Sequence, residues 1–319
     1  MWMMGHTATV VISSLNEGPS LPRTVQSCLE TIRTPSVEIL VADDHSEDSS
    51  VEEVRRLFPE VLIAAHDRRR GVSPTKDLGG RRASGDVLVF LDGHCKPEPG
   101  AIDRLIENVA RLDGRAIITP AVCALDTATW QNQHRQVGHG YRLELLGFSC
   151  GWLAPDALRP RGEFYESPAL IGCALAISRA LYEELLGFDT GMKEWGVEDL
   201  DFGLKAWLMG SMVLNDPKAL IGHRFRRTFD NYTVGAVHPL ANQLRMARKH
   251  FTESVWLEWL TTRQRSYQAW PEVWSDASRA LAQEADSLER ERAYLLDRRM
   301  RDEYWYAEYF NLRWPCREA

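Results

Sequence analysis

Two residues with metal-binding side chains stand two positions apart, directly after a short apolar run. Asp92 and His94 follow residues 87–91, which are all hydrophobic, and Gly93 between them allows a tight turn. A carboxylate and an imidazole at this spacing can both reach one divalent cation, and such an ion neutralises the charge that develops on a departing diphosphate. The same three letters also describe an ordinary turn, so the pair needs support from other residues.

A second acidic pair, Glu198 and Asp199, opens a helix-like segment at residues 198–209. Acidic residues at a helix N-terminus commonly complement the helix dipole, which favours their charged form. We therefore expect Asp199 to be ionised at neutral pH. An ionised carboxylate is what a general base requires.

A third candidate is His223, which follows the apolar run at residues 219–221. A single histidine after a strand more often has a structural role than a metal-binding one. It gains weight from Asp92 and His94, because two imidazoles and a carboxylate form a ligand set that suits Mn²⁺.

The first half of the chain alternates strand and helix signals. Short runs rich in Val, Ile and Leu predict strands at residues 9–13, 37–42, 61–65 and 86–91. Helical spacing of apolar residues predicts helices at residues 21–32, 51–58, 76–83 and 100–112. Strands that alternate with helices form a mostly parallel sheet with helices on both faces, so the predicted fold class is α/β.

Polar residues follow three of these strands. Asn16 and Glu17 come after the first strand, Asp44 after the second, and Asp92 and His94 after the fourth. In open α/β sheets, ligands bind beyond the carboxyl ends of the strands. We therefore expect these side chains to meet in one site.

The second half is less regular. Residues 130–166 are rich in Gly, His and aromatics without periodicity, which favours loops and short pieces around a site. A strand at residues 170–178 and a helix at residues 179–186 follow. After about residue 263 the chain becomes charged and helical, so we predict a main domain at residues 1–262 and a helical C-terminal appendage at residues 263–319. The aromatic cluster at residues 304–310 should cover the main domain or form a homodimer contact.

The composition is that of an ordinary globular protein. The net charge of −7 argues against nucleic-acid binding, which needs a basic face. No run approaches the length of a membrane span, and residues 1–7 lack the features of a signal peptide, so we expect a cytoplasmic protein without an integral membrane segment. The six cysteines form no Cys-x-x-Cys pair, and we expect all but Cys173 to be small buried side chains.

The order of these motifs resembles that of GT-A fold glycosyltransferases of the large inverting family 2, and the motifs are also strongly similar to those of the polypeptide N-acetylgalactosaminyltransferases. The resemblance covers about residues 8–230. Its segments read VVISSLNE (10–17), LPRTVQSCLE (21–30), ILVADDHSED (39–48), GDVLVFLDGHCKP (85–97), SPALIGCALAISR (167–179), FDTGMKEWGVEDLDFGLKAW (188–207) and IGHRFR (221–226). The resemblance implies a GT-A fold and sugar transfer from a nucleotide-sugar donor.

Site roles follow from the same resemblance. It implies that Asp92, His94 and His223 bind Mn²⁺, or Mg²⁺ in its place, and that Asp44 holds the uracil of UDP. Further residues that it places around the donor are Ser13, Asn16, Glu17, Lys76, Gly172 and Cys173. The loop after His223, through about residue 239, is expected to close over the donor.

Two departures from the N-acetylgalactosaminyltransferases bear on the reaction. Those enzymes have Glu-Asn where this chain has Glu198-Asp199, and they retain the anomeric configuration. Glu-Asp is the pattern of inverting enzymes, so Asp199 is the predicted base, and Glu198 and Trp195 shape the sugar and acceptor pocket. A Gly-Gly pair beside the donor sugar is Gly172-Cys173 here. Because the thiol narrows that pocket, the preference for GalNAc is not carried over.

The resulting prediction is a metal-dependent, inverting transfer from a UDP-sugar to a soluble acceptor, for which a peptide is one candidate. A retaining enzyme like the N-acetylgalactosaminyltransferases is the first alternative. A nucleotidyltransferase is the second, although residues 13–17 lack the Gly-rich basic loop expected of that class. A module that binds UDP without turning over a sugar is the third.

Overall fold

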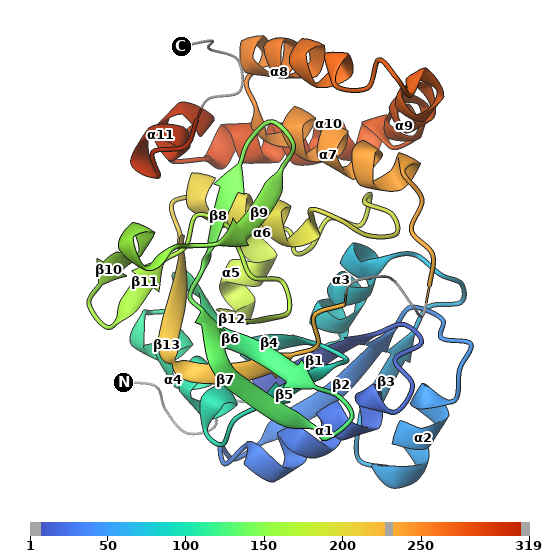
Figure 1. Ribbon diagram of the computed structural model, residues 1–319, viewed down its shortest axis with the longest axis vertical. Coiled ribbons are helices and arrows are strands. Elements are labelled where there is room, and N and C mark those ends of the chain that lie inside the picture. The colour runs from blue at the N-terminus through green and yellow to red at the C-terminus, as the bar shows by residue number, and fades with distance from the viewer. Residues whose placement is uncertain (1–7, 227–231, 314–319) are drawn as a thin grey trace.

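The computed structural model describes residues 8–226 and 232–313, and its first half alternates strands and helices as predicted (Figure 1). The strands are β1 (Ala8–Ser14), β2 (Val37–Asp43), β3 (Leu62–Ala65) and β4 (Val87–Asp92). The helices are α1 (Ser20–Thr31), α2 (Ser50–Leu57), α3 (Val72–Arg82) and α4 (Ala101–Arg111). Each element lies within a few residues of the range predicted for it.

The second half contains more strand than the sequence indicates. Residues 130–166, predicted as loops and short pieces, form β7 (Gln131–Gly138), β8 (Tyr141–Glu144), β9 (Ser149–Trp152), η1 (Pro155–Ala157), β10 (Arg159–Arg161) and β11 (Phe164–Glu166). The other elements up to residue 226 are β5 (Cys95–Pro97), β6 (Ala116–Asp126), β12 (Ala174–Ser178), α5 (Arg179–Glu184), α6 (Glu198–Leu208) and β13 (Met212–His223). The short strands arise from pairing with neighbours, as β8 pairs with β9, rather than from a local hydrophobic pattern.

One sheet of eleven strands forms the centre of the molecule, in the order β10-β11-β13-β6-β12-β4-β1-β2-β3, with β5 on β13 and β7 on β6. The pairs of β1 with β2 and β4, of β2 with β3 and of β6 with β13 are parallel, whereas β12 runs antiparallel to both of its neighbours. The predicted mostly parallel α/β fold is therefore confirmed.

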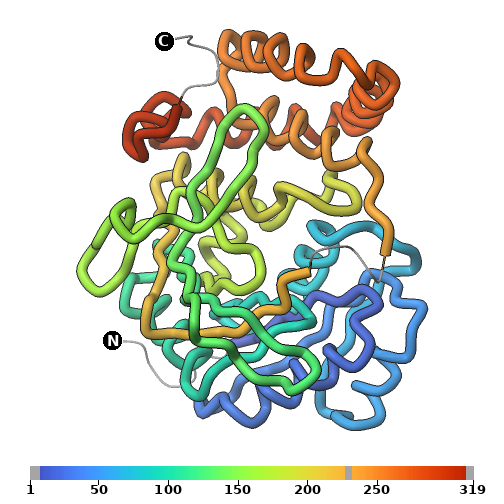
Figure 2. Tube along the Cα trace, viewed as in Figure 1, coloured from blue at the N-terminus to red at the C-terminus, as the bar shows by residue number. Residues whose placement is uncertain are grey.

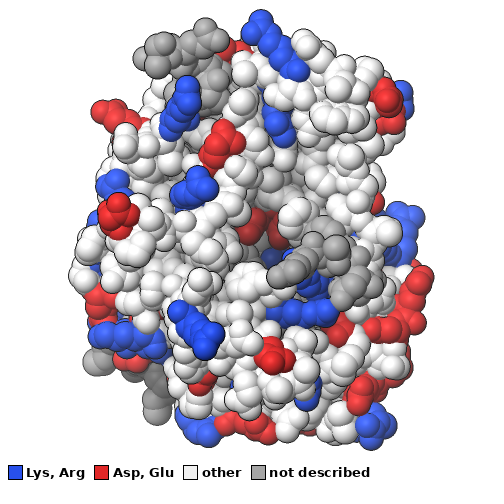
Figure 3. Space-filling view, in the orientation of Figure 1, with Lys and Arg blue, Asp and Glu red and all other residues white. Residues whose placement is uncertain are grey.

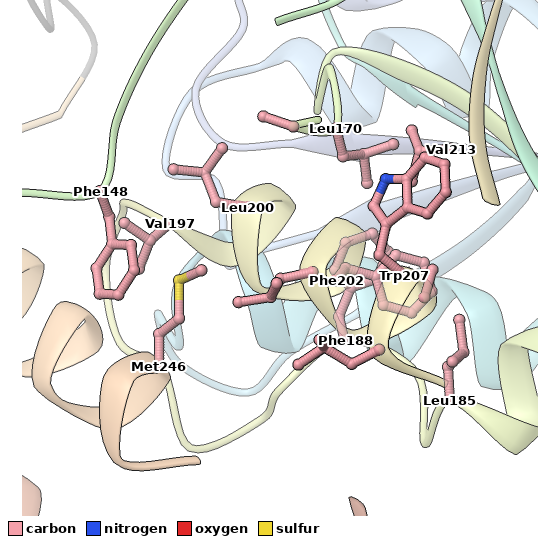
Figure 4. Packing of buried hydrophobic residues seen from close by; sticks show 14 of the residues in the cluster. Phe148, Leu170, Leu185, Phe188, Val197, Leu200, Phe202, Trp207, Val213 and Met246 are labelled. Carbon is pink, nitrogen blue, oxygen red and sulfur yellow. The ribbon is translucent and has the colours of Figure 1, made fainter. Parts of the chain in front are cut away.

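Alternate residues of the central strands feed two separate hydrophobic cores, because successive side chains of a strand point to opposite faces. Val11 of β1 and Phe90 of β4 face a core with α5 and α6, part of which Figure 4 shows. Val10 and Val89 face a core with α1, α2 and α4. Because these strands are buried on both faces, the carboxyl ends of β1, β2 and β4 are held together at one edge of the sheet.

Five helices complete the described chain: α7 (Val237–His250), α8 (Glu253–Arg265), α9 (Pro271–Gln283), α10 (Ala285–Arg298) and α11 (Glu303–Tyr309). The predicted domain limit near residue 262 falls inside α8. Figure 2 shows these helices gathered at one end of the molecule. Tyr306 and Phe310 are buried in the same core as Trp207 of α6, so the aromatic cluster covers the main domain, as one of the two expectations had it. The homodimer contact stays a prediction.

The cysteines follow the prediction with one exception. Cys28, Cys95 and Cys123 are buried, but Cys150 is exposed because it lies on β9, which pairs only with β8 in a separate two-stranded sheet. Cys316 lies outside the described residues. Within the described ranges, no helix combines the length and the apolar character that a bilayer span requires.

Candidate active site

A cavity of about 610 Å³ opens beyond the carboxyl ends of β1, β2 and β4, with the start of α6 in its wall. Figure 3 shows this hollow, in which acidic side chains lie next to basic ones. All predicted site residues line it except Asn16. The side-chain oxygen of Asn16 instead accepts a hydrogen bond from the backbone N–H of Glu47 at 2.7 Å, which joins the loop after β1 to the loop after β2.

Three of the predicted metal ligands converge. The Nε2 atoms of His94 and His223 lie 3.1 Å apart, and Nε2 of His223 lies 3.5 Å from Oδ2 of Asp92. Metal bonds of about 2.1 Å place neighbouring ligand atoms roughly 3 Å apart, so these separations fit one ion. All three ligand atoms lie within 4.8 Å of one another. The donor set of two imidazoles and a carboxylate therefore fits a divalent cation such as Mn²⁺.

Glu17 contacts one histidine of this cluster. Its Oε2 lies 3.0 Å from Nδ1 of His94 and is also bound by the guanidinium of Arg226. A carboxylate at Nδ1 favours the N–H there and leaves Nε2 with its lone pair for a metal. Glu17 was predicted to contact the nucleotide, and it does line the cavity, but the contacts present here orient a metal ligand. Arg226 ends the IGHRFR motif but was not among the predicted site residues.

Lys76 is the cation at the centre of the acidic groups. Its side chain is 2% exposed, and Nζ lies 3.0 Å from the carbonyl oxygen of Gly172, 3.4 Å from Glu198 and 3.7 Å from Asp92. Burial by itself lowers the pKa of Lys76, but the surrounding carboxylates, Asp92 foremost, raise it above its usual value. Burial likewise opposes ionisation of Asp92, but Lys76 and His223 hold the pKa of Asp92 below its usual range. Lys76 thus links Asp92 of β4 to Glu198 of α6.

Asp199 differs from the sequence prediction in its charge. It lines the cavity at the start of α6, but burial and the neighbouring Glu198 raise its pKa to about 7. Lys76 and the Leu200 N–H oppose this rise without cancelling it. The expectation that the helix dipole keeps Asp199 ionised is therefore wrong at and below neutral pH, because loss of hydration outweighs the dipole.

Gly172 and Cys173 form the wall beside these acids. The predicted strand at residues 170–178 begins only at Ala174, and the preceding residues pass along the cavity. A Cβ added at Gly172 would lie 2.6 Å from Oδ2 of Asp199, so only glycine fits there. Cys173 is 7% exposed and lines the same cavity.

Ser13 and Asp44 lie at the carboxyl ends of β1 and β2. The Asp44 carboxylate accepts backbone N–H bonds from Arg70 at 2.6 Å and Gly71 at 2.9 Å, while burial raises the pKa of Asp44. Ser13 Oγ lies 3.3 Å from the carbonyl oxygen of Leu91. Both residues line the cavity at strand ends.

Aromatic side chains form part of the cavity and its surroundings. Trp195 is 44% exposed and Phe225 is 47% exposed, and both line the cavity. Phe225 stacks edge-on against the ring of His223 with centroids 4.7 Å apart. Trp195 was among the predicted residues. Phe225, Tyr141 and Tyr232 were missed, because loop aromatics carry no periodic signal.

A mostly parallel sheet with a metal-ligand cluster at the strand ends defines a protein of the GT-A fold. The sequence profile of glycosyl transferase family 2 matches residues 9–186, and the chain belongs to that family. A second profile, the N-terminal domain of galactosyltransferase, matches residues 157–227.

Curated relatives are polypeptide N-acetylgalactosaminyltransferases. Polypeptide N-acetylgalactosaminyltransferase 10 of Rattus norvegicus is 29% identical over 262 residues, which is 78% of this chain and 42% of that protein. Polypeptide N-acetylgalactosaminyltransferase 4 of Mus musculus is 31% identical over 232 residues, which is 69% of this chain and 40% of that protein. The chain thus spans about two fifths of the length of these relatives.

Solved structures share the fold. GalNAc-T7 with UDP, GalNAc and Mn²⁺ superimposes with a TM-score of 0.74 at 23% identity, covering 96% of this chain and 57% of that one. The mannosyltransferase PcManGT of Pyrobaculum calidifontis, in complex with GDP-Man and Mn²⁺, has a TM-score of 0.52 at 18% identity and covers 91% of this chain and 84% of that one. These matches confirm the predicted GT-A fold.

Proposed function

We propose that the protein is a metal-dependent glycosyltransferase that moves a sugar from a UDP-sugar donor to an acceptor hydroxyl or thiol. The observation that carries the proposal is that one cavity is lined by both the Asp92, His94 and His223 cluster and the acid Asp199. UDP as the nucleotide is supported by the position of Asp44 at the end of β2 and by the UDP in the GalNAc-T7 structure.

Asp92, His94 and His223 would hold Mn²⁺ or Mg²⁺. Such an ion supplies positive charge that stabilises a diphosphate as it leaves. Glu17 orients His94 for this role through Nδ1. Lys76 favours the ionised form of Asp92 and holds Asp92 and Glu198 in place, since its ammonium lies within 4 Å of both carboxylates.

Asp199 is the proposed base. A pKa of about 7 is close to the pH at which the enzyme would work, and proton transfer is most effective when the two match. In its ionised form Asp199 accepts the acceptor proton while the acceptor attacks the anomeric carbon from the face opposite the departing UDP. The product is then inverted, β-linked from an α-linked donor.

A retaining reaction is the second candidate. The relatives favour it, because they are named polypeptide N-acetylgalactosaminyltransferases, and enzymes of that kind retain the anomeric configuration. The Glu198-Asp199 pair favours inversion, and the stereochemistry of the product separates the two. Membership of glycosyl transferase family 2 gives the nucleotidyltransferase alternative no support.

The acceptor enters beside the aromatic residues. Trp195 and Phe225 offer exposed ring faces at the cavity, and such faces bind apolar peptide side chains or the flat face of a sugar. We propose a soluble acceptor, with a peptide as the first to test because of the names of the relatives.

Hydrolysis of UDP-sugars tests the proposal without knowledge of the acceptor. A panel of UDP-sugars is incubated with the protein and Mn²⁺ or Mg²⁺, and free UDP is measured. We expect slow release of UDP from at least one donor, its loss in EDTA and its return when Mn²⁺ is added. Metal-dependent binding of UDP without turnover of any donor, with or without peptides, would identify a binding module instead.

A further inference from the structure

The segment at residues 193–197, which leads into α6, has an unusual backbone. Glu194, Gly196 and Val197 all have positive φ angles, of 53°, 110° and 62°. Val197 is the residue that precedes the first turn of α6, and a β-branched side chain is disfavoured in this left-handed region. Such a conformation persists only where the surrounding structure holds it.

A single side chain of α7 makes four contacts with this segment. The Nδ2 of Asn242 donates to the carbonyl oxygens of Lys193 at 2.8 Å and of Trp195 and Gly196 at 3.3 Å each. Its Oδ1 accepts from the N–H of Lys193 at 3.0 Å. Asn242 is 3% exposed, so these bonds are shielded from water.

Helix α7 is itself fixed against α6 and the loop before it. His250 and Lys249 bind the two carboxylate oxygens of Asp201, at 2.8 Å and 2.9 Å, and Nε of Arg245 lies 2.7 Å from Asp189. All five of these side chains are buried. Figure 4 shows Met246 of α7 at the same end of the core as Val197. Asn242 therefore reaches the segment from a rigid support.

We propose that Asn242 is a positioning residue, which holds the 193–197 segment so that Trp195 lies at the cavity and Glu198 and Asp199 face into it. It does not line the cavity and lies outside both family profiles, which end at residues 186 and 227. The role in turnover rests on the proposed function. The hold on the segment does not, because it follows from the contacts alone.

Two variants separate the contacts. Asn242→Asp keeps an oxygen for the Lys193 N–H but loses the donor to three carbonyls, and Asn242→Ala loses all four contacts. The control is Leu288→Ala, which removes a buried side chain from a different helix, α10. It destabilises the fold by leaving a cavity and so matches a general loss of stability.

Hydrogen exchange and kinetics give the readouts. We expect at least tenfold faster exchange of the Lys193 amide, whose N–H donates to Oδ1 of Asn242, in Asn242→Ala and not in Leu288→Ala. The kcat for UDP-sugar hydrolysis should fall at least tenfold, while the affinity for Mn²⁺ with UDP, from calorimetry, stays within twofold, because Asp44 and the metal ligands are untouched. Unchanged exchange in Asn242→Ala, or the same local increase in the control, would overturn the positioning role.

A separate measurement shows whether the proposed function is wrong. In that case the wild-type protein would turn over no donor. The exchange comparison between Asn242→Ala and Leu288→Ala decides the positioning role in either case.

Discussion

The Nε2 atoms of His94 and His223 lie 3.1 Å apart although 129 residues separate them in the chain. The pairing of β5 with β13 produces this proximity, because His223 stands opposite Cys95, the residue after His94. Glu17 then fixes the ring of His94 through Nδ1. A strand register and one buried carboxylate therefore bring the two imidazoles together.

Loss of one imidazole should weaken metal binding while the fold persists. We expect His223→Ala to lower the affinity for Mn²⁺ in the presence of UDP by at least about tenfold, since even residues that only support a ligand contribute about 10–100-fold. Metal-dependent turnover should be lost, and the melting temperature should change little. Calorimetry measures the affinity for Mn²⁺, and thermal unfolding measures the melting temperature. The control is His134→Ala, whose side chain is 61% exposed. A fully active His223→Ala variant would refute the assignment.

Removal of the base should slow transfer and spare donor binding. Asp199→Asn keeps the shape of the side chain and should cost about 10²–10⁴-fold in kcat. UDP affinity should hold, because Asp44 and the metal ligands remain. Asp297→Asn, at a side chain that is 73% exposed, serves as the control. An α-linked wild-type product in the NMR coupling constants would show that the enzyme retains configuration, and wild-type turnover in Asp199→Asn would show that Asp199 is not the base.

The same variant should alter stability in a pH-dependent way. The pKa of Asp199 is about 7 in the folded protein and near 3.8 when unfolded, so the folded state favours the protonated form. The contribution of Asp199 to the free energy of unfolding is therefore fully present below pH 3.8 and is lost as the pH rises through 7. Asp199→Asn cannot ionise and should melt at a higher temperature than wild type at pH 8, with a smaller difference at pH 5. Equal differences at both pH values would contradict the raised pKa.

Cys173 should restrict the donor sugar. Cys173→Gly removes the thiol from the cavity wall, and we expect it to raise kcat/KM for UDP-N-acetylhexosamines relative to UDP-hexoses by roughly 10-fold, the usual scale for one small group in a pocket. Competition between the two donor classes measures the ratio. Cys28→Ala, buried on α1, is the control. An unchanged ratio in Cys173→Gly would remove this residue from donor selection.

The C-terminal helices should stabilise the main domain. Tyr306 is 1% exposed, and its hydroxyl donates to the carbonyl oxygen of Pro168 at 2.6 Å. Tyr306→Ala should lower the free energy of unfolding by about 3–5 kcal/mol, as for other large aromatic truncations. Tyr304→Ala on the same helix, where the side chain is 45% exposed, should cost about 0.5 kcal/mol or less. Denaturant unfolding compares them, and equal losses would mean that α11 does not brace the core.

The amino-acid sequence alone predicts the sheet edge and most of the side chains that meet there. Apolar runs located β1, β2 and β4, and the polar residues after them had to meet because parallel strands end at one edge. For this reason Asp44, Asp92 and His94 could be assigned before any contact was known. His223 and Asp199 needed the motif resemblance in addition, since a lone histidine or a helix-capping acid has commoner structural roles.

Tertiary structure decided the properties that depend on residues distant in the chain. The pKa of Asp199 is set by burial and by Glu198, and no local pattern reports burial at a cavity wall. Glu17 faces His94, and Lys76 faces Asp92 and Glu198, because elements that are far apart in the chain pack together here. Asn242 sits in an ordinary helix sequence, and its four bonds to residues 193–196 exist only because buried ion pairs dock α7 on α6.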